Sequence, residues 1–423
     1  MFYLGIDFGT SGARSCVMDA GGAILAEDTR DFGTLQEHEQ ADTWREALWD
    51  LITALPPAIR SQLSSLSIDG TSGTVIACDD TLKALHAPLL YNDDRAGDEA
   101  RQIQTLAPAG HPAAAATSGL AKVLWLKRRL GLAGSRIYLN QADWLSGLLT
   151  GQPGFTDYHN ALKMGLDLDA LGWPDWVEHL ADGRTLPRPV APGSFIATLS
   201  RPRARYLGVD AGCRVHAGTT DSIAAFLAAG VNQSGSAVTS LGSTLVLKLL
   251  SDTRVESIGH GIYSHWFGPR WLAGGASNAG GAVLRQFFDD RQLAALSAHI
   301  DPAVASPLDY LPLPGRGERF PVNDPELAPR LSPRPADDVE FLHGLLESLA
   351  RIEARGYALL QELGASPVTQ VVTAGGGSNN PVWVRIRQRL LKVPVARAHH
   401  VEAAYGAALL ARDGQQLFAA RAS

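Results

Sequence analysis

Residues 2–12 read FYLGIDFGTSG, and this stretch decides the fold. A run of apolar and β-forming residues ends in a glycine-rich turn, and a second such run follows over residues 13–18, which predicts a β-hairpin. The turn combines a carboxylate, glycines and hydroxyl groups. Glycines let backbone N–H groups approach phosphate oxygens, hydroxyls add donors, and Asp7 is able to hold the water shell of a Mg²⁺ ion. The segment therefore predicts a metal–phosphate site.

A second hairpin of the same design is predicted far downstream, where residues 237–249 read AVTSLGSTLVLKL. The two tips offer the same kinds of residue: Gly9, Thr10, Ser11 and Gly12 in the first, and Gly242, Ser243 and Thr244 in the second. Most glycine–hydroxyl hairpins are plain turns, so either one alone is weak evidence. Because the two occupy equivalent places in two halves of the chain, they predict a pair of loops that grip the phosphates of one ATP molecule.

Size and composition limit the class of protein. A chain of 423 residues exceeds the length at which one core stops growing, so two domains are expected. The net charge of −6, without a Lys/Arg stripe, argues against a nucleic-acid partner. No apolar stretch approaches the ~18 residues that span a bilayer, which predicts no membrane partner. The first strand begins at Phe2 and leaves no room for a signal peptide, so a cytoplasmic protein is expected.

After the β-rich start, helical and strand patterns alternate, which predicts an α/β fold. A helix over residues 222–229 ends at Gly230, the residue type found just beyond helix ends, and the domain boundary is expected there. Residues 279–288 read as another helix. Residues 172–208 are rich in Pro and Gly and show no clear pattern.

Asp221 follows the short strand 215–218 and a polar turn, and it immediately precedes an apolar helix. An Asp in this position is a routine N-cap, which contributes about 1 kcal/mol to helix stability. A carboxylate near the positive end of a helix is also held ionised and oriented, as a general base should be. Phosphoryl transfer needs only a weak base that orients the attacking hydroxyl and takes its proton late. The two interpretations of Asp221 are compatible.

Residues 375–380 read GGGSNN and lie between a strand at 371–374 and a helix at 383–391. Three glycines let the backbone lie flat against a planar or phosphate group, and the following helix N-terminus favours anions; the alternative is a flexible turn. Other chemistries lack their motifs: the sequence has no Gly-Lys-Ser/Thr P-loop, no paired His or Cys of a zinc site and no Gly-x-Ser-x-Gly elbow. Residues 91–95, YNDDR, fit either a polyol site or a solvated charge cluster.

Taken in order, these segments resemble the FGGY carbohydrate kinases of the actin, sugar-kinase and heat-shock ATPase superfamily. The segments that carry the resemblance are GIDFGTS at 5–11, AGTTD at 217–221, SLGST at 240–244, TAGGGSNN at 373–380 and EAAYGAA at 402–408. They cover nearly the whole chain. Within the family, DGTSGT at 69–74, QADWL at 141–145, DYHNALK at 157–163 and GERFP at 317–321 are similar to the compact D-ribulose kinases of cyanobacteria and plants.

The resemblance implies two actin-like (ribonuclease H-like) α/β domains with ATP and sugar in a cleft between them. It implies Asp221 as the base and a sugar contact, Asp7 as a residue that binds Mg²⁺ through water and lies near the sugar, and Ser72 as another sugar contact. The adenosine site would be formed by Gly376, Gly377 and Asn380. Because the last helix of the family packs back on the first domain, residues 1–228 with 402–423 are expected to bind sugar, and residues 229–401 to bind the nucleotide.

The expected reaction is the ATP- and Mg²⁺-dependent phosphorylation of D-ribulose to D-ribulose 5-phosphate by a monomer or homodimer. The same fold serves D-xylulose and other polyol kinases, and a nucleotide-switched interaction protein like actin or the heat-shock chaperones is a further alternative. One departure from the family bears on the sugar site. The Trp that usually opens the Trp-x-Asp-x-Arg motif is Tyr91 here, which leaves open whether Asp93 and Arg95 contact sugar.

Overall fold

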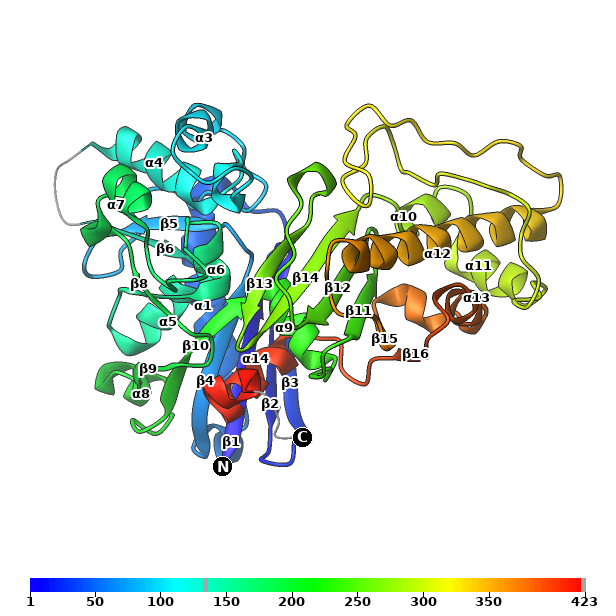
Figure 1. Ribbon diagram of the computed structural model, residues 1–423. Helices are drawn as coiled ribbons and strands as arrows, with labels where there is room; N and C mark the ends of the chain where they lie inside the picture. The colour runs from blue at the N-terminus through cyan, green and yellow to red at the C-terminus, as the bar shows by residue number, and fades with distance from the viewer. Residues whose placement is uncertain (132–135, 420–423) are drawn as a thin grey trace. The chain divides into compact units, whose positions relative to one another are not determined.

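The computed structural model describes residues 1–131 and 136–419 and divides into two compact units, each built around a mixed β-sheet (Figure 1). The first unit comprises residues 1–228 and 402–423, and the second comprises residues 229–401. Each unit combines a six-stranded sheet with packed helices, which is the predicted α/β fold of two actin-like domains.

The sheet of the first unit has the strand order β3-β2-β1-β4-β10-β9. Its strands are β1 (Phe2–Phe8), β2 (Gly12–Met18), β3 (Ile24–Asp31), β4 (Leu63–Gly70), β9 (Phe195–Thr198) and β10 (Arg214–Thr220). The first three form an antiparallel meander that includes the predicted hairpin, while β1, β4 and β10 run parallel to one another. The carboxyl ends of these three strands therefore lie along one edge of the sheet.

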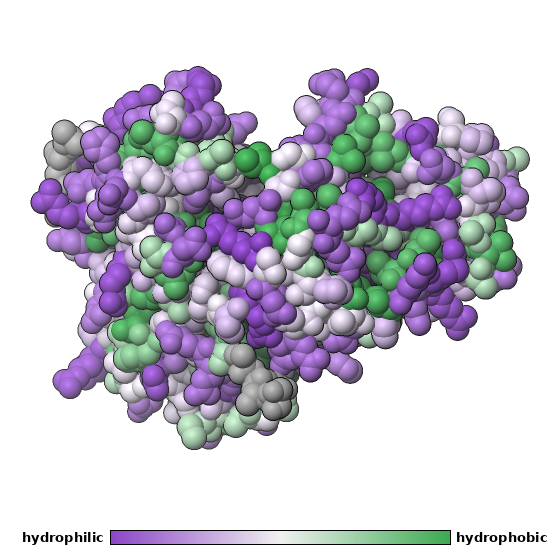
Figure 2. Space-filling view, viewed as in Figure 1, coloured by the Kyte–Doolittle hydropathy of each residue, from purple (hydrophilic) through white to green (hydrophobic). Residues whose placement is uncertain are grey.

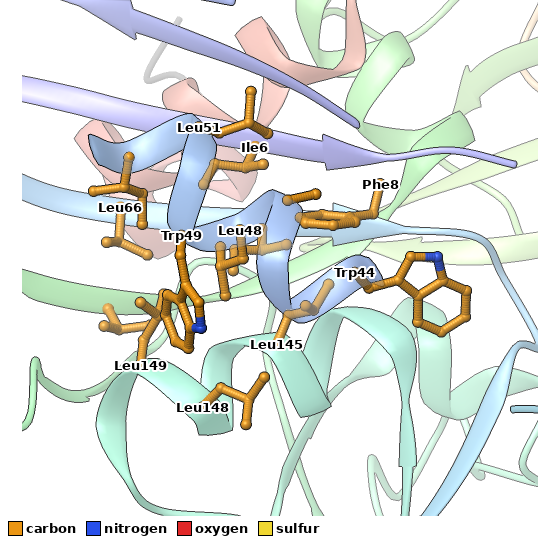
Figure 3. Packing of buried hydrophobic residues seen from close by; sticks show 14 of the residues in the cluster. Ile6, Phe8, Trp44, Leu48, Trp49, Leu51, Leu66, Leu145, Leu148 and Leu149 are labelled. Atoms are coloured by element: carbon orange, nitrogen blue, oxygen red, sulfur yellow. The ribbon is translucent and has the colours of Figure 1, made fainter. Parts of the chain in front are cut away.

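Helices cover both faces of this sheet. On one face, α1 (Gln40–Thr53) and α5 (Gln141–Thr150) pack against alternate residues of β1 and β4 in an apolar core, which includes Ile6, Phe8 and Trp44 (Figure 3). On the other face lie α9 (Asp221–Ala228) and α14 (Ala403–Asp413), which contact each other and the strands β1 and β4.

A further layer of the first unit has its own apolar core. Its elements include β5 (Val75–Cys78), α3 (Gly97–Gln104), α4 (Gly119–Leu130), β6 (Ile137–Asn140) and α7 (Asp175–Ala181). The remaining elements of the first unit are α2 (Pro57–Arg60), β7 (Phe155–Asp157), α6 (Tyr158–Leu162), β8 (Arg188–Val190) and α8 (Arg201–Leu207), of which α2 and α8 pack against the core of the six-stranded sheet. Thus residues 172–208, which showed no clear pattern, contain two helices and two strands. These elements are only three to seven residues long, too short for a periodic pattern to emerge.

The second unit has the strand order β13-β14-β12-β11-β15-β16. Its elements are β11 (Ser236–Leu241), β12 (Leu245–Ser251), β13 (Tyr263–Phe267), β14 (Arg270–Ser277), α10 (Gly281–Leu284), α11 (Asp290–Ser297), α12 (Asp338–Glu362), β15 (Gln370–Ala374), α13 (Pro381–Leu391) and β16 (Val395–Arg397). The helix expected over 279–288 is wrong: only the four residues of α10 are α-helical. Its first turn is tied to the β11–β12 tip by backbone bonds from Gly281 N–H to Gly242 C=O and from Ala282 N–H to Ser243 C=O.

Hydrophilic and hydrophobic residues are interspersed over the face shown in Figure 2. Within residues 1–131 and 136–419, every helix is too short or too polar to cross a bilayer.

The C-terminal helix α14 approaches its neighbours so closely that only glycine fits at two contacts (Figure 1). A Cβ atom added to Gly5 of β1 would lie 2.0 Å from the carbonyl oxygen of Ala404, and one added to Gly406 of α14 would lie 1.9 Å from that of Ala224 in α9. Backbone atoms block both positions, so no side-chain movement would relieve the clash.

We expect Gly406→Ala to lower the free energy of unfolding by at least about 1–3 kcal/mol, because α14 and α9 must move apart. Gly97→Ala is the matched control, since its added Cβ would have only the end of the Arg101 side chain within 4 Å, at 3.9 Å. Urea unfolding of both variants measures the effect. Equal stability of the two variants would contradict the close approach of the helices.

Candidate active site

Three carboxylates meet at the carboxyl edge of the first unit's parallel strands. Asp7 on β1 lies opposite Asp69 on the neighbouring strand β4, and Asp221 follows the end of β10 on the other side of β4. Asp69 is fully buried and Asp7 is 5% exposed, whereas Asp221 is partly exposed. The sequence analysis selected Asp7 and Asp221 but not Asp69, because the strand pairing that joins Asp69 to them is not encoded locally.

Burial and mutual repulsion control the charge of this cluster. Oδ1 of Asp7 and both oxygens of Asp69 accept no hydrogen bond from any other described residue. Burial, followed by the neighbouring Asp7 carboxylate, raises the pKa of Asp69 well above its usual range. Burial also raises the pKa of Asp7, although Arg14 opposes this with Nη1 3.5 Å from Oδ2. The two neighbouring carboxyl groups therefore both bind a proton more tightly than an isolated aspartate would.

The cluster also bears on metal binding. Within the described residues, no three or more His, Cys, Asp or Glu side chains are grouped to hold a metal ion. Mg²⁺ does not need such a group, because it keeps several waters and takes one or two protein carboxylates together with phosphate oxygens. Oδ1 of Asp7, which lacks a donor, fits a water of such an ion.

Asp221 is the first residue of α9, one position later than the N-cap expected from the sequence. Its Oδ1 accepts a hydrogen bond of 2.6 Å from the N–H of Ser222. The carboxylate therefore still lies at the positive end of the helix, which favours its ionised form. It is close enough to the Asp7–Asp69 pair to raise the pKa of both.

Ser72 lies in the loop after β4 and is partly buried. The loop is held by Lys122, a fully buried residue of α4 whose Nζ donates to the carbonyls of Gly73 (2.7 Å), Leu90 (2.5 Å) and Thr117 (2.9 Å). One ammonium group thus joins three loops that are far apart in sequence. The sequence analysis missed Lys122, and its only local signal is a lysine among the apolar residues of the predicted helix.

The charged residues of segment 91–95 bind each other. Arg95 is 2.9 Å from carboxylate oxygens of both Asp93 and Glu37, and its guanidinium lies over the ring of Trp125 at 5.5 Å. These contacts favour the charge-cluster interpretation for Arg95. Tyr91 remains 42% exposed.

The tip of the first hairpin is closed by a hydrogen bond from Gly9 N–H to Gly12 C=O, 3.0 Å long. Thr10 and Ser11 are exposed at this tip. Two exposed hydroxyl residues thus lie between two glycines at the tip, and their binding of phosphate stays a prediction.

The second hairpin has the same kind of tip in the second unit. Gly242 N–H donates to Thr244 C=O over 3.1 Å, and both Gly242 and Ser243 are exposed. Its attachment to α10 holds the tip in place. Each hairpin tip is therefore ordered within its own unit.

Beside the second hairpin lies a cavity of about 480 Å³, which is within the size range of small-molecule sites. Gly376 and Gly377 line one side, and Asn380 lines another. Oδ1 of Asn380 accepts from the first N–H groups of α13, and its Nδ2 donates to Ser297 over 2.8 Å. Asn380 thus builds the cavity wall and caps the helix behind it.

Below this cavity, a buried ion pair joins the elements that form it. Arg387 of α13 makes two 2.6 Å bonds to the carboxylate of Glu353 in α12 and one of 2.7 Å to Thr373 at the end of β15. Glu353 also accepts from Thr239, which lies in β11 just before the second hairpin tip. The sequence analysis missed this network, because neither charged residue has a motif.

A second acidic pair lies deeper in the first unit. Oδ2 of Asp143 accepts from the backbone N–H and the side-chain amide of Asn140, at 3.3 and 3.0 Å. Burial, followed by repulsion from Asp157, raises the pKa of Asp143 to about 8. Burial raises the pKa of Asp157 to about 6, although Asn160 and His159 donate hydrogen bonds to its carboxylate.

These shifts predict a pH-dependent stability. The folded state binds the proton of Asp143 more tightly than the unfolded chain, so this group lowers stability as the pH rises from about 4 to about 8. Asp143→Asn keeps an oxygen for Asn140 and cannot ionise. We expect the difference in unfolding free energy, variant minus native protein, to rise by about 3 kcal/mol between about pH 5 and about pH 8. Urea titrations at several pH values measure it, and a constant difference would contradict the shift.

Comparison with known proteins identifies the family. The model of the FGGY family of carbohydrate kinases matches this chain through its N-terminal domain at residues 2–228 and its C-terminal domain at residues 237–412. Xylulose kinases from Staphylococcus epidermidis and Bacillus subtilis are 23% and 22% identical, covering 97% and 99% of this chain and 87% and 89% of their own lengths. These relatives are named xylulose kinases, so they do not bear out the expected likeness to D-ribulose kinases.

Solved structures agree on the fold. A xylulose kinase from Rhodospirillum rubrum superposes with a TM-score of 0.83 at 21% identity, covering 98% of this chain and 90% of that one. A structure described as a xyloylose kinase from Brucella ovis superposes with a TM-score of 0.86 at 21% identity, covering 99% and 92%. With both domain models matched across almost the whole sequence, the chain belongs to the FGGY family of carbohydrate kinases.

Proposed function

We propose that this protein transfers the γ-phosphoryl group of ATP to the terminal hydroxyl of a pentulose. The observation that carries the proposal is the placement of Asp7 and Asp221 at the carboxyl ends of parallel strands in one unit, close enough for their charges to interact. Asp7 would act on the metal and the phosphates, and Asp221 would act on the attacking hydroxyl of the sugar. A binding protein without turnover would not need both.

In this mechanism Asp221 accepts the proton of the attacking hydroxyl as the bond to phosphorus forms. A carboxylate is basic enough, since the proton leaves late in a loose transition state. Asp7 would hold a hydrated Mg²⁺ through water, and it lies opposite Asp69 at the strand edge. When bound, Mg²⁺ neutralises charge on the phosphates. The hairpin tips donate to phosphate oxygens, and the 480 Å³ cavity takes adenosine.

Two pentuloses have support as the substrate. D-ribulose is favoured by segments 69–74 and 157–163, which include Ser72 and are similar to those of D-ribulose kinases. D-xylulose is favoured by the relatives, which are named xylulose kinases. A few hydrogen bonds decide which of the two sugars is the better substrate, so the fold does not distinguish between them.

The first test of function is an ATP-consumption assay with Mg²⁺ and a panel of D-ribulose, L-ribulose, D-xylulose, L-xylulose and glycerol. We expect the highest kcat/KM for D-ribulose, because the segments nearest the carboxylates carry that likeness. A preference for D-xylulose would contradict the expected substrate but would still agree with kinase activity. ATP hydrolysis that no sugar stimulates would favour a nucleotide-switched protein instead.

The second test changes the base. Asp221→Asn keeps the shape of the side chain and the oxygen that accepts from the N–H of Ser222, so stability and ATP binding should hold. We expect kcat for sugar phosphorylation to fall on the order of 10²-fold or more, as when a positioned base is lost. Asp175→Asn is the matched control, because Asp175 is also the first residue of a helix in the same unit and is exposed. Normal turnover by Asp221→Asn would exclude Asp221 as the base.

A further inference from the structure

A small hollow in the first unit has no role in the mechanism above. Its volume is about 130 Å³, and its wall includes Thr10, Gln40, Trp44, Thr71, Tyr91 and Gln141. Thr10 and Thr71 come just after β1 and β4, so the hollow opens at the strand edge that carries Asp7 and Asp69. Gln40 and Gln141 are the first residues of α1 and α5. Two helix N-termini therefore meet the hollow, and their partial positive charge favours an oxygen there.

Gln141 presents an unused donor to this hollow. The residue is 1% exposed, and its Oε1 accepts from the backbone N–H and the hydroxyl of Thr71 at 3.0 and 2.9 Å. Because an N–H group must face an oxygen, the bond from Thr71 fixes which way the amide points. Nε2 is then buried and has no acceptor among the described residues. A buried amide donor without a partner costs about 1–3 kcal/mol, which a ligand oxygen would recover.

Gln40 presents the complementary group. It is 8% exposed, and its Oε1 is buried without a donor from the part of the chain that the structure describes. The hollow thus offers one donor and one acceptor. A hydroxyl group satisfies both, since it accepts one hydrogen bond and donates another. The dianion of a phosphate monoester does not, because none of its oxygens carries a proton for Gln40.

We propose that this hollow binds a sugar hydroxyl remote from the one that is phosphorylated, with Gln141 donating to its oxygen and Gln40 accepting its proton. The inference rests on the proposed function and adds to it the residues that select the sugar. The rings of Trp44, which is 4% exposed, and Tyr91 give the hollow apolar surface for the C–H groups beside that hydroxyl. For a ketopentose phosphorylated at C5, the remote end is C1.

The decisive variant is Gln141→Glu. A carboxylate keeps the acceptor for Thr71 and replaces the amide donor with a second acceptor, so the loop stays tied. The single proton of the hydroxyl then serves only one of the two acceptors, and one hydrogen bond to the sugar is lost. We expect KM for the preferred pentulose to rise about tenfold or more, with KM for ATP unchanged within about twofold, since one lost hydrogen bond corresponds to about a factor of ten. Gln102→Glu, which adds the same charge at an exposed site on α3, should change neither constant.

A second measurement removes the hydroxyl instead of the protein group. The native protein should prefer the pentulose over its 1-deoxy analogue by about tenfold or more in kcat/KM, and both Gln141→Glu and Gln40→Met should lose most of this preference. If Gln141→Glu fails to fold, Gln40→Met carries the test alone. Unchanged discrimination in a folded variant would overturn the proposal, as would a loss of ATP affinity equal to the loss of sugar affinity.

Failure of the proposed function gives a different result. If the native protein phosphorylates no sugar in the panel, calorimetric titration of the intact protein with D-ribulose and D-xylulose, without ATP, still tests the hollow. Sugar binding that is weakened about tenfold by Gln141→Glu would support it. The absence of sugar binding, or binding that the variant leaves unchanged, would overturn it.

Discussion

The active site of this kinase depends on how closely α14 approaches β1 and α9. Backbone touches backbone at Gly5 and Gly406, and the hydroxyl of Ser65 on β4 donates to the carbonyl of Ala411 near the end of the helix. A helix in such contact leaves its neighbours no freedom to slide. The end of β1, with Asp7, and the start of α9, with Asp221, are therefore fixed relative to each other by a segment almost 200 residues further along the chain.

This rigid edge brings together acids that repel each other. Three carboxylates at one sheet edge would lower stability if all were ionised, and burial together with their mutual repulsion raises the pKa of both Asp7 and Asp69. Such an arrangement lowers stability, and carboxyl groups with shifted pKa values are typical of functional sites. The Arg387–Glu353 pair has the opposite character: it is buried and fully hydrogen-bonded, and it joins α12 and α13 to Thr373 near the end of β15.

The sequence predicted the features that depend on local patterns. Both hairpins, the helix after Asp221 and the strand before the triple glycine are encoded by short runs of residues, and the structure has all of them. Asp69, Lys122 and Gln141 could not be found in this way, because their roles arise from partners between 30 and 70 residues away. The helix expected over 279–288 was wrong for a related reason, since contacts to the β11–β12 tip shape its first turn.

The proposed catalytic groups and the proposed sugar-selecting groups lie on different parts of the same sheet edge. The carboxylates lie on the face covered by α9 and α14, whereas Gln40 and Gln141 begin the helices on the opposite face. Substitutions at the two glutamines leave the carboxylates in place, so a change of substrate needs no change in the chemistry. Relatives about 22% identical retain the fold, but hydrogen-bonding residues of this kind are free to differ between them. The name of a relative therefore predicts the reaction better than it predicts the sugar.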